Sequence, residues 1–264
     1  MKNIIVITGA SSGLGRELAR QTAREAGIDE IWAIARRTDR LESLAEELGL
    51  PVRAISADLS TSEGIEVYRT ALAEESPSIR LLCNCAGFGK FNHYERETTE
   101  TYMNMIDLNI KSVVGMTDAS LPYMKEGARI MNIASCAAFQ PIPYINVYAA
   151  TKSFVLSYSR ALNVELRYRG IRVIAVCPYW TKTEFFDRAI ADKNEKQVII
   201  NYGVMYDAER VVARALRDLG RGKDISVYGA VNNGQRLLVK LLPHPFIMRI
   251  WNRRQKFNGT PDIR

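Results

Sequence analysis

The sequence contains few of the residues that build metal sites and histidine-centred triads. Its 264 residues include only two histidines, His93 and His244. A triad that depends on histidine, or a histidine-rich metal site, is therefore not expected, and no metal ligands are predicted. The four cysteines lie in or beside apolar runs, without the spacing of a metal site, and are Cys83, Cys85, Cys136 and Cys177. We interpret them as reduced thiols of a cytoplasmic protein, three of them buried.

Long hydrophobic runs are also missing. A membrane-spanning helix needs about 18 or more consecutive apolar residues, and no stretch of this chain reaches that length. The N-terminus has only the short apolar run Ile4-Ile5-Val6-Ile7, which does not make a signal peptide. Hydrophobic residues make up 47% of the chain and charged residues 25%, as is typical of a globular protein with a sizeable core. The length suits one large α/β domain or two small ones.

Short runs rich in Ile, Val and Leu alternate with longer segments of helical apolar spacing. The expected strands cover residues 3–7, 30–36, 52–56, 80–84, 129–133, 171–176 and 224–228. Helical spacing covers residues 14–26, 40–48 and 61–75, among others. Nearly continuous apolar strands separated by helices predict an α/β fold, with a parallel sheet covered by helices on both faces. Such sheets bind ligands at the carboxyl ends of their strands, so the residues that follow each strand form the candidate site.

The first strand runs into a glycine-rich loop with the spacing Gly-x-x-x-Gly-x-Gly, and a helix follows it. Glycines let the backbone turn tightly and approach a pyrophosphate, and the start of a helix supplies N–H groups and a positive dipole. The loop therefore predicts a phosphate cradle, although an ordinary strand-to-helix turn also favours Gly and Ser. The residues expected in this cradle are Gly9, Ser11, Ser12, Gly13, Leu14 and Gly15.

No acidic residue follows the second strand, where an acid would hold the ribose hydroxyls of NAD. The small residue Ala35 is followed there by Arg36 and Arg37. A guanidinium group suits a phosphate, because it forms charge-assisted, forked hydrogen bonds with it. This pattern predicts a preference for the 2′-phosphate of NADP, with NAD the less favoured cofactor. The alternative is a pair of exposed surface arginines.

Polar or small residues also follow the third, fourth and fifth strands. Small residues after the fourth strand let a ligand lie against the strand ends. Asn109 lies in a helical stretch over residues 103–114, where it is either part of the site or a buried, satisfied amide. The strand-end residues expected at the site are Asp58, Leu59, Asn84, Ala86, Gly87 and Ser135.

Tyr148 and Lys152 are spaced one turn apart in a segment of helical character that extends to about Tyr168. Residues four apart share one face of a helix, so the phenol and the ammonium can act at one point. A neighbouring cation favours the phenolate and is expected to lower the pKa of Tyr148 towards the range useful for proton transfer. The alternative is a surface Tyr and Lys on an amphipathic helix.

Taken together, these motifs resemble those of the short-chain dehydrogenase/reductase family over roughly residues 3–230. The resemblance rests on the glycine loop, Asp58, Asn84-Cys85-Ala86-Gly87, Asn109, Ser135, the pair Tyr148-x-x-x-Lys152 and residues Pro178 to Thr183. It implies a Rossmann-type doubly wound sheet of about seven parallel strands. It also implies an NAD(P)-dependent oxidoreductase that interconverts a carbonyl and a secondary alcohol. A dinucleotide-binding sensor without catalytic activity is the alternative.

The resemblance also implies a role for each site residue. Tyr148 would exchange a proton with the substrate oxygen, and Lys152 would lower the tyrosine pKa and hold the nicotinamide ribose. Ser135 would donate a hydrogen bond to the developing oxyanion, and Asn109 would position a water beside Lys152. The cofactor contacts after the sixth strand would come from Pro178, Thr183 and, as a weaker candidate, Thr181.

The sequence departs from the family pattern at two positions. The motif after the fourth strand has Cys85 where the family usually has a second Asn, so one supporting hydrogen bond is expected to be missing. After the sixth strand the family usually has Pro-Gly, and this chain has Pro178-Tyr179. The ring of Tyr179 is expected beside the nicotinamide, where it narrows the site or stacks on a substrate.

The region after the sixth strand is expected to form the substrate side. A helix is expected over residues 184–196, within a lid over about 183–206. The apolar content of the lid and nearby loops favours a lipophilic small-molecule carbonyl or alcohol; packing among the lid residues themselves is an equal alternative. The apolar candidates are Phe88, Phe91, Phe139, Ile142, Tyr144, Tyr179, Phe185 and Phe186.

The C-terminal end of the chain is basic. Residues 221–264 hold nine Lys and Arg against two Asp, so they carry the whole net charge of +7. We expect one domain over residues 1–230 and an extension over 231–264 of two amphipathic helices broken by Pro243 and Pro245. This extension packs on the domain, covers the pocket or forms the contact of a homodimer or homotetramer; peripheral membrane contact is a less favoured alternative. No nucleic-acid recognition motif accompanies the basic residues.

Overall fold

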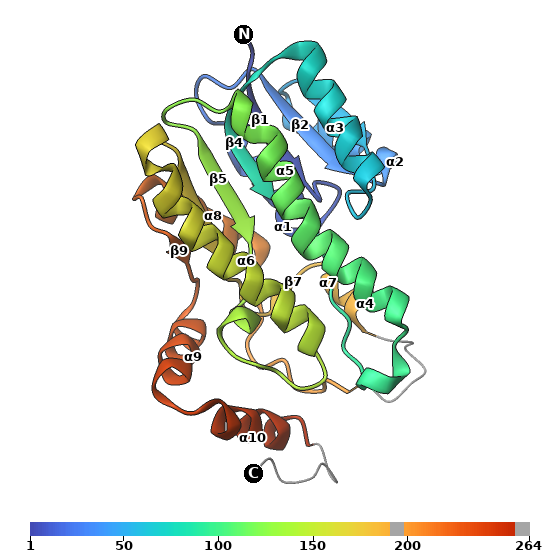
Figure 1. The fold of residues 1–264 in the computed structure, drawn as a ribbon, viewed down its shortest axis with the longest axis vertical. Coiled ribbons are helices and arrows are strands. Elements are labelled where there is room, and N and C mark those ends of the chain that lie inside the picture. Colours follow the sequence, from blue (N-terminus) through green and yellow to red (C-terminus); the bar gives the residue numbers. More distant parts are fainter. Residues whose placement is uncertain (191–197, 257–264) are drawn as a thin grey trace.

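The structure is a computed structural model, and it describes residues 1–190 and 198–256. Its centre is a seven-stranded sheet in the order β3-β2-β1-β4-β5-β6-β9, with every neighbouring pair parallel (Figure 1). This confirms the predicted doubly wound parallel sheet. The strands are β1 (Asn3–Thr8), β2 (Glu30–Ala35), β3 (Val52–Ser56), β4 (Ser78–Asn84), β5 (Arg129–Ile133), β6 (Arg172–Val176) and β9 (Ile225–Ser226).

Side chains alternate between the two faces of the sheet, and a separate apolar core covers each face. In β1, Ile4 and Val6 join one core, whereas Ile5 and Ile7 join the other. The first core is completed by α3 (Ser62–Glu75), α5 (Ser112–Ser120) and α6 (Asn146–Glu165). The second is completed by α1 (Gly13–Thr22), α2 (Thr38–Leu48) and α8 (Ala208–Gly220). The continuous apolar strands are thus explained by burial on both sides.

Strand β1 lies at the point where the strand order reverses. Its neighbours are β2 on one side and β4 on the other. The chain runs from β1 to α1 on one face of the sheet, and from β4 to α5 on the other face. The loops that follow β1 and β4 therefore diverge and leave a crevice at their carboxyl ends. This topology places the glycine loop and the residues after β4 at one site.

The last strand is shorter than the sequence suggests. Strand β9 pairs with β6 only over Ile225–Ser226, instead of residues 224–228. Gly229, at φ +92°, turns the chain from this short strand into the next helix. The sequence pattern detects apolar residues but not the place where the chain leaves the sheet.

The segment after β6 forms the elements expected on the substrate side and the C-terminal helices. It contains β7 (Thr181–Lys182), α7 (Phe185–Ala189), β8 (Tyr206–Asp207), α9 (Ala230–Leu241) and α10 (His244–Arg254). Helix α7 covers only the first part of the helix expected over 184–196, and residues 191–197 lie outside the described residues. Two helices form in the expected extension, and Pro243 and Pro245 mark the start of α10.

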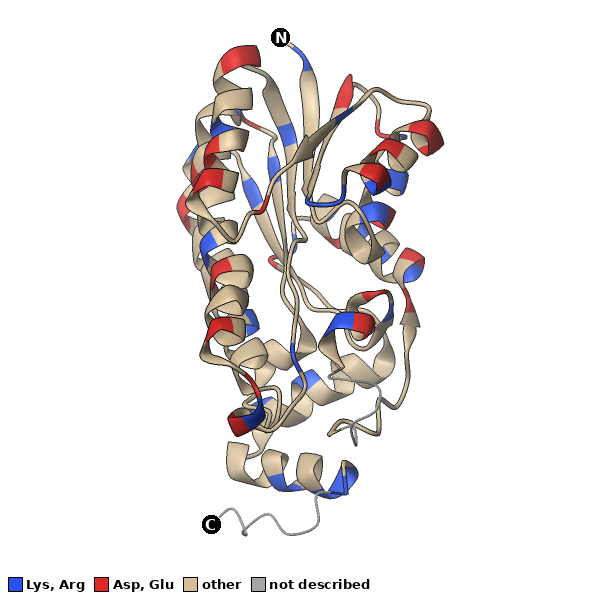
Figure 2. Cartoon of the chain, turned by 90° about the vertical axis from the view of Figure 1, so that its right-hand side faces the viewer, with Lys and Arg blue, Asp and Glu red and all other residues tan. Residues whose placement is uncertain are grey.

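Helices α9 and α10 lie at the end of the molecule towards which β5 points (Figure 1). Helix α10 contains arginines and no acidic residue, so its ribbon is blue in places and nowhere red (Figure 2). In the described parts of the chain, no helix combines the length and the apolar character needed to cross a membrane.

Candidate active site

A cavity of about 460 Å³ follows the carboxyl ends of the strands from the glycine loop to α9 and α10. The predicted site residues come together there from distant parts of the sequence. Every one of them lines the cavity except Asn84 and Asn109, which lie behind its wall. The lining residues are Gly9, Ser11, Ser12, Gly13, Leu14, Gly15, Arg36, Arg37, Asp58, Leu59, Ala86, Gly87, Ser135, Tyr148, Lys152, Pro178, Thr181 and Thr183.

The glycine loop is compact because its glycines touch other backbone atoms. A Cβ on Gly9 (φ +66°) would lie 2.9 Å from the backbone nitrogen of Ala86, and one on Gly15 would lie 2.4 Å from the carbonyl oxygen of Gly9. Ser12 is the N-cap of α1, but its side chain makes no capping hydrogen bond to a described residue. The first N–H groups of α1 thus remain available to an anion, as a phosphate cradle requires.

Thr8 joins this loop to the end of β4, and the sequence reasoning missed it. Its Oγ1 accepts hydrogen bonds from the backbone N–H groups of Cys85 (2.9 Å) and Ala86 (3.0 Å). Its position directly before Gly9 was the available signal. Cys85 lines the cavity as the departure from the family pattern, and burial raises its pKa to about 12, so its thiol stays protonated near neutral pH.

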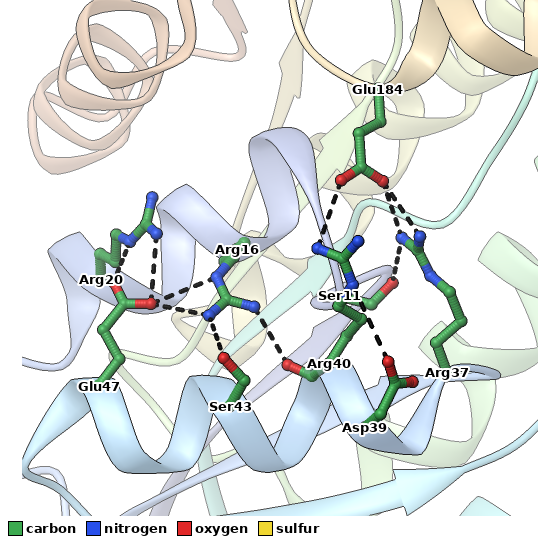
Figure 3. A network of polar contacts seen from close by, with 9 residues as sticks. All are labelled: Ser11, Arg16, Arg20, Arg37, Asp39, Arg40, Ser43, Glu47 and Glu184. Carbon is green, nitrogen blue, oxygen red and sulfur yellow. Dashed lines mark hydrogen bonds and ion pairs between the residues drawn. The ribbon is translucent and has the colours of Figure 1, made fainter.

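The two arginines after β2 lie at the same end of the cavity. Nη1 of Arg36 is 3.5 Å from Oδ2 of Asp58. Both terminal nitrogens of Arg37 donate to Glu184 at 3.1 Å, and Nη2 also donates to Oγ of Ser11 at 3.1 Å (Figure 3). Nε of Arg37 is buried and has no partner among the described residues. Both arginines line the cavity, but only Arg37 is half-buried, whereas the side chain of Arg36 is exposed.

Carboxylates already compensate part of this positive charge. Burial opposes ionisation of Asp58, but hydrogen bonds from Ser60 and the charge of Arg36 outweigh it and lower the pKa of Asp58. Arg188 of α7 is a third cation on the cavity wall, which the sequence reasoning missed. Burial and the charges of Arg36 and Arg37 lower its pKa. This end of the cavity thus suits a ligand that brings negative charge.

Tyr148 and Lys152 both face the cavity from α6, as the helical spacing predicts. Nζ of Lys152 donates a hydrogen bond to the carbonyl oxygen of Ile133 at 2.8 Å and lies 5.7 Å from the centre of the Tyr148 ring. Burial lowers the pKa of Lys152 to about 8. A proton on Lys152 is therefore easily exchanged near neutral pH.

The pKa of Tyr148 contradicts the expectation from the sequence. Burial raises it above its usual value, and the interaction with Ser135 only partly offsets this rise. Lys152 does not lower it here, because its ammonium is directed to the Ile133 carbonyl. A lowered tyrosine pKa was expected from spacing alone, which carries no information about desolvation.

Ser135 and Asn109 support this pair in different ways. Ser135 follows β5, and its Oγ accepts a hydrogen bond from the N–H of Ala137 at 3.1 Å, so its hydroxyl proton can point towards Tyr148. Asn109 is fully buried in a π-helical turn; its amide donates to the Phe88 carbonyl and to Oγ1 of Thr151 and accepts from the Phe88 N–H. Such turns are frequent at functional sites.

Asn84 does not contact the cavity. Its amide donates to Oδ1 of Asn132 at 2.8 Å and to Oγ1 of Thr117 at 3.3 Å, on the face of the sheet covered by α5. The alternation of side chains along β4 directs it there. Asn84 thus links β4 to β5 below the cavity, and its expected contact with a cofactor stays a prediction.

The residues after β6 form one wall of the cavity. Oγ1 of Thr181 donates to the carbonyl of Tyr179 at 2.9 Å, so this hydroxyl is already engaged. Thr183 lies against the glycine loop, where a Cβ on Gly13 would be 3.2 Å from its own Cβ. The ring of Tyr179 packs edge-on against Trp180 and Tyr206.

Only part of the predicted apolar set reaches the cavity. Phe88, Ile142, Tyr179, Phe185 and Phe186 line it. Phe91, Phe139 and Tyr144 lie outside the lining, and Phe91 packs against Trp180 and Phe185. The sequence did not single out the lining residues Gln140, Trp180, Val231, Gln235, Leu238, Val239, Ile247, Ile250, Trp251 and Arg254.

All four cysteines are free, and Cys83, Cys136 and Cys177 are buried, which confirms the expectation of three buried thiols. Among the described residues no group of His, Cys, Asp and Glu side chains has the arrangement of a metal site.

The fold and the site match those of known proteins. A family profile described as short chain dehydrogenase matches residues 3–194. The chain is similar to sulfoacetaldehyde reductase 2 of Chromohalobacter salexigens, with 37% identity over 194 residues, which is 70% of this chain and 75% of that protein.

Solved structures agree. One is a short-chain dehydrogenase from Sphingobium yanoikuyae in complex with NADPH (TM-score 0.75, 28% identity, 91% of this chain and 96% of that chain). Another is a 3-ketoacyl-(acyl-carrier-protein) reductase from Brucella melitensis complexed with NADH (TM-score 0.70, 26% identity, 82% of this chain and 90% of that chain). The chain belongs to the short-chain dehydrogenase family and is a nucleotide-binding oxidoreductase.

Proposed function

We propose that the protein is an NADP-dependent oxidoreductase that interconverts a carbonyl and a secondary alcohol, with Tyr148 as the acid/base. The observation that carries this proposal is the single cavity, which joins the phosphate cradle and two arginines to Ser135, Tyr148 and Lys152. A binding protein without turnover does not need these three side chains together.

The shape and the hydrogen-bond donors of the cavity fit a dinucleotide. The close backbone approach at Gly9 and Gly15 leaves no side chain between the loop and a pyrophosphate. The free N–H groups at the start of α1 provide donors, and the unpartnered Nε of Arg37 provides another. When bound, the nicotinamide cofactor supplies or accepts the hydride, and the protein supplies orientation and electrostatics.

Reduction of a carbonyl requires a proton donor and a group that stabilises negative charge on oxygen. Tyr148 gives the proton to the substrate oxygen and removes it in the reverse direction. Ser135 donates a hydrogen bond to the same oxygen. The raised pKa of Tyr148 keeps its phenol protonated before turnover, as a proton donor must be.

Lys152 assists Tyr148 by holding a charge next to the proton-transfer step. Its pKa of about 8 lets it gain or release a proton near neutral pH. A bound ribose offers hydroxyl groups to Nζ, and Asn109 positions a water that links Lys152 to solvent. Gly87 leaves room for this arrangement, because a Cβ there would lie 2.8 Å from Oδ1 of Asn109 and 3.4 Å from Nζ of Lys152.

The preference for NADP rests on Arg36 and Arg37. Glu184 holds Arg37 in this structure, and a 2′-phosphate offers more oxygens and more negative charge than this carboxylate. The substrate side supports a lipophilic carbonyl or alcohol, because aromatic side chains line it. We further propose a homodimer or homotetramer that works in the cytoplasm, where its four free thiols stay reduced.

The test has two stages. NADPH fluorescence on titration with the protein measures binding, and NADPH consumption against a panel of ketones and aldehydes measures turnover. Tyr148→Phe is expected to keep NADPH affinity and to lose at least ~100-fold in kcat, because the proton donor is removed.

Tyr168→Phe is the matched control, because this tyrosine is exposed and lies outside the cavity lining. Appreciable turnover by Tyr148→Phe contradicts the catalytic assignment. Tight NADPH binding without consumption over the whole panel, in both directions, supports a dinucleotide sensor instead.

A further inference from the structure

Arg254 is a cation on the cavity wall that the proposed reaction does not use. It is the last residue of α10 and lines the same cavity as Tyr148. The other lining cations have a place: Arg36, Arg37 and Arg188 surround the cofactor cradle, and Lys152 lies beside Tyr148.

No acid neutralises Arg254 among the described residues. The acidic side chains that line the cavity are Asp58 and Glu184, and they face Arg36 and Arg37 at the cofactor end. The described contact of Arg254 is with the hydroxyl of Tyr179, a neutral group. Among the residues that the structure describes, the side of the cavity formed by α9 and α10 therefore carries a positive charge that no acid compensates.

The wall that α9 and α10 form is apolar apart from Gln235 and Arg254. Leu238 and Val239 of α9 and Ile247, Ile250 and Trp251 of α10 line the cavity on this side. Arg254 is itself exposed, so an ionised group beside it can keep contact with water. The wall therefore combines a surface for an apolar body with a single charged end.

Several contacts hold α10 against the substrate side. Nε1 of Trp251 donates to the carbonyl of Pro143 at 3.2 Å. Oε1 of the buried Gln255 accepts from the N–H groups of Ile200 and Asn201 at 3.0 and 2.9 Å, and its Nε2 donates to the Asn201 carbonyl at 2.9 Å. These bonds fix the backbone on either side of Arg254 and limit where its guanidinium can reach.

The lid leaves space for this guanidinium. Gly203 adopts φ +63°, and a Cβ there would lie 2.9 Å from Nη2 of Arg254. A side chain at this position would require the guanidinium to shift. The guanidinium thus lies between Gly203 of the lid and the Tyr179 hydroxyl, to which it is hydrogen-bonded.

We propose that Arg254 binds an anionic group of the substrate, a carboxylate or a sulfonate, at the far end of an apolar body from the reacting carbon. The substrate class is then an amphipathic carbonyl or alcohol with one acidic end. Guanidinium groups bind such planar or multi-oxygen anions through forked hydrogen bonds. This inference rests on the proposed function, because it names the substrate class of the same site.

The test compares matched substrates that differ only in charge. Alicyclic and steroidal ketones that carry a carboxylate are each paired with the corresponding carboxamide. The wild type is expected to show a kcat/KM about 10-fold or more higher for each acid, since a hydrogen bond to a charged group exceeds one to a neutral group. Arg254→Gln is expected to abolish this preference by raising KM for each acid to about that for its amide.

Arg253→Gln is the matched control, because Arg253 is the exposed neighbour that does not line the cavity. It is expected to retain the preference for the acid. If Arg254 only supports Tyr179 and the lid, Arg254→Gln impairs acid and amide equally, and that result overturns the proposal. Equal kcat/KM for acid and amide in the wild type overturns it as well, while leaving the oxidoreductase function intact.

Calorimetric titration of the NADP-loaded protein with the acids and amides provides a readout without turnover. A preference for the acids that is lost in Arg254→Gln and kept in Arg253→Gln supports the proposal even if no pair is turned over. Binding of the acids without turnover would contradict the proposed reaction but not the proposed anion site. If the wild type binds acids and amides with equal affinity, the proposal of an anion site at Arg254 is overturned.

Discussion

Lys152 lies one helical turn from Tyr148, yet its ammonium is bonded to the Ile133 carbonyl. The spacing of the two residues is a property of the helix and follows from the sequence. The direction of each pKa shift depends on burial, which only the packed molecule supplies: burial raises the pKa of Tyr148 and lowers that of Lys152 to about 8. The phenol of Tyr148 is therefore protonated near neutral pH, as its proposed role of proton donor requires.

The lowered pKa of Lys152 predicts a pH-dependent stability. The unfolded chain keeps the proton up to the ordinary value of 10.5, whereas the folded protein releases it near pH 8. The unfolded state thus binds more protons in this window, and stability rises with pH. Between about pH 8 and about pH 10, the wild type should gain up to ~2 kcal/mol in unfolding free energy relative to Lys152→Met.

Urea unfolding at several pH values measures this difference. Lys125→Met is the control, because Lys125 is exposed, and its difference from the wild type is expected to stay constant. A constant difference for Lys152→Met over the same range would show that the ammonium is not desolvated.

Arg36 provides a second test at a single residue. Arg36→Ala is expected to weaken NADPH binding about 10-fold or more and NADH binding by less than about threefold, because only NADPH brings a 2′-phosphate. Dissociation constants from nucleotide fluorescence measure both. Arg40→Ala is the control, since Arg40 pairs with Glu184 but does not line the cavity. Equal weakening of both nucleotides by Arg36→Ala would indicate general electrostatics without phosphate recognition.

Among the elements, α1 and α2 form one unit beside the phosphate cradle. Arg16 and Arg20 of α1 both bind Glu47 of α2, and Arg16 also donates to Ser43 (Figure 3). Hydrogen bonding to Arg20 lowers the pKa of Glu47. The start of α1 is thus anchored through its neighbour, and the loop that precedes it can keep a fixed shape.

Substitution of Ala for Gly should change the stability of the protein in opposite directions at two helical glycines. Ala normally stabilises a helix interior relative to Gly by about 0.5–1 kcal/mol. Gly234 in α9 has open space around it, so Gly234→Ala is expected to follow this rule. A Cβ on Gly15 in α1 would lie 2.4 Å from the Gly9 carbonyl oxygen, so Gly15→Ala should destabilise by about 1–3 kcal/mol and weaken NADPH binding.

Urea unfolding and NADPH titration of both variants measure these effects. Each variant is the control for the other, because both replace a helical glycine by alanine. Similar stabilities for the two variants would mean that the glycine loop can shift to accommodate the added Cβ. The phosphate cradle would then not depend on the close approach of Gly15 to the Gly9 carbonyl.

At the scale of the whole molecule, α9 and α10 close the substrate side of the cavity and also present apolar side chains to solvent. Leu237, Leu241 and Phe246 are 60%, 72% and 47% exposed. Exposed apolar groups that lie together commonly mark an interface. We expect a second copy of the chain to cover them, in line with the proposed homo-oligomer.

Leu241→Glu tests this surface. Light scattering coupled to size exclusion should give a dimer or tetramer for the wild type and a monomer for the variant, because a charge in an apolar contact is costly to desolvate. Tyr168→Glu is the control, as this residue is 86% exposed and belongs to the short turn Leu166–Arg169 that follows α6. A monomeric wild type that floats with anionic liposomes would instead support contact with a membrane surface.

The sequence by itself determined the sheet, the glycine loop and the Tyr148 and Lys152 pair. Strand burial, the need for glycine and i, i+4 spacing are local properties that the order of residues contains. Only the tertiary structure directed Asn84 away from the cavity and placed Arg254 on the cavity wall. It also raised the pKa of Tyr148. These outcomes depend on which distant segments meet and exclude water, and no local pattern in the chain records that.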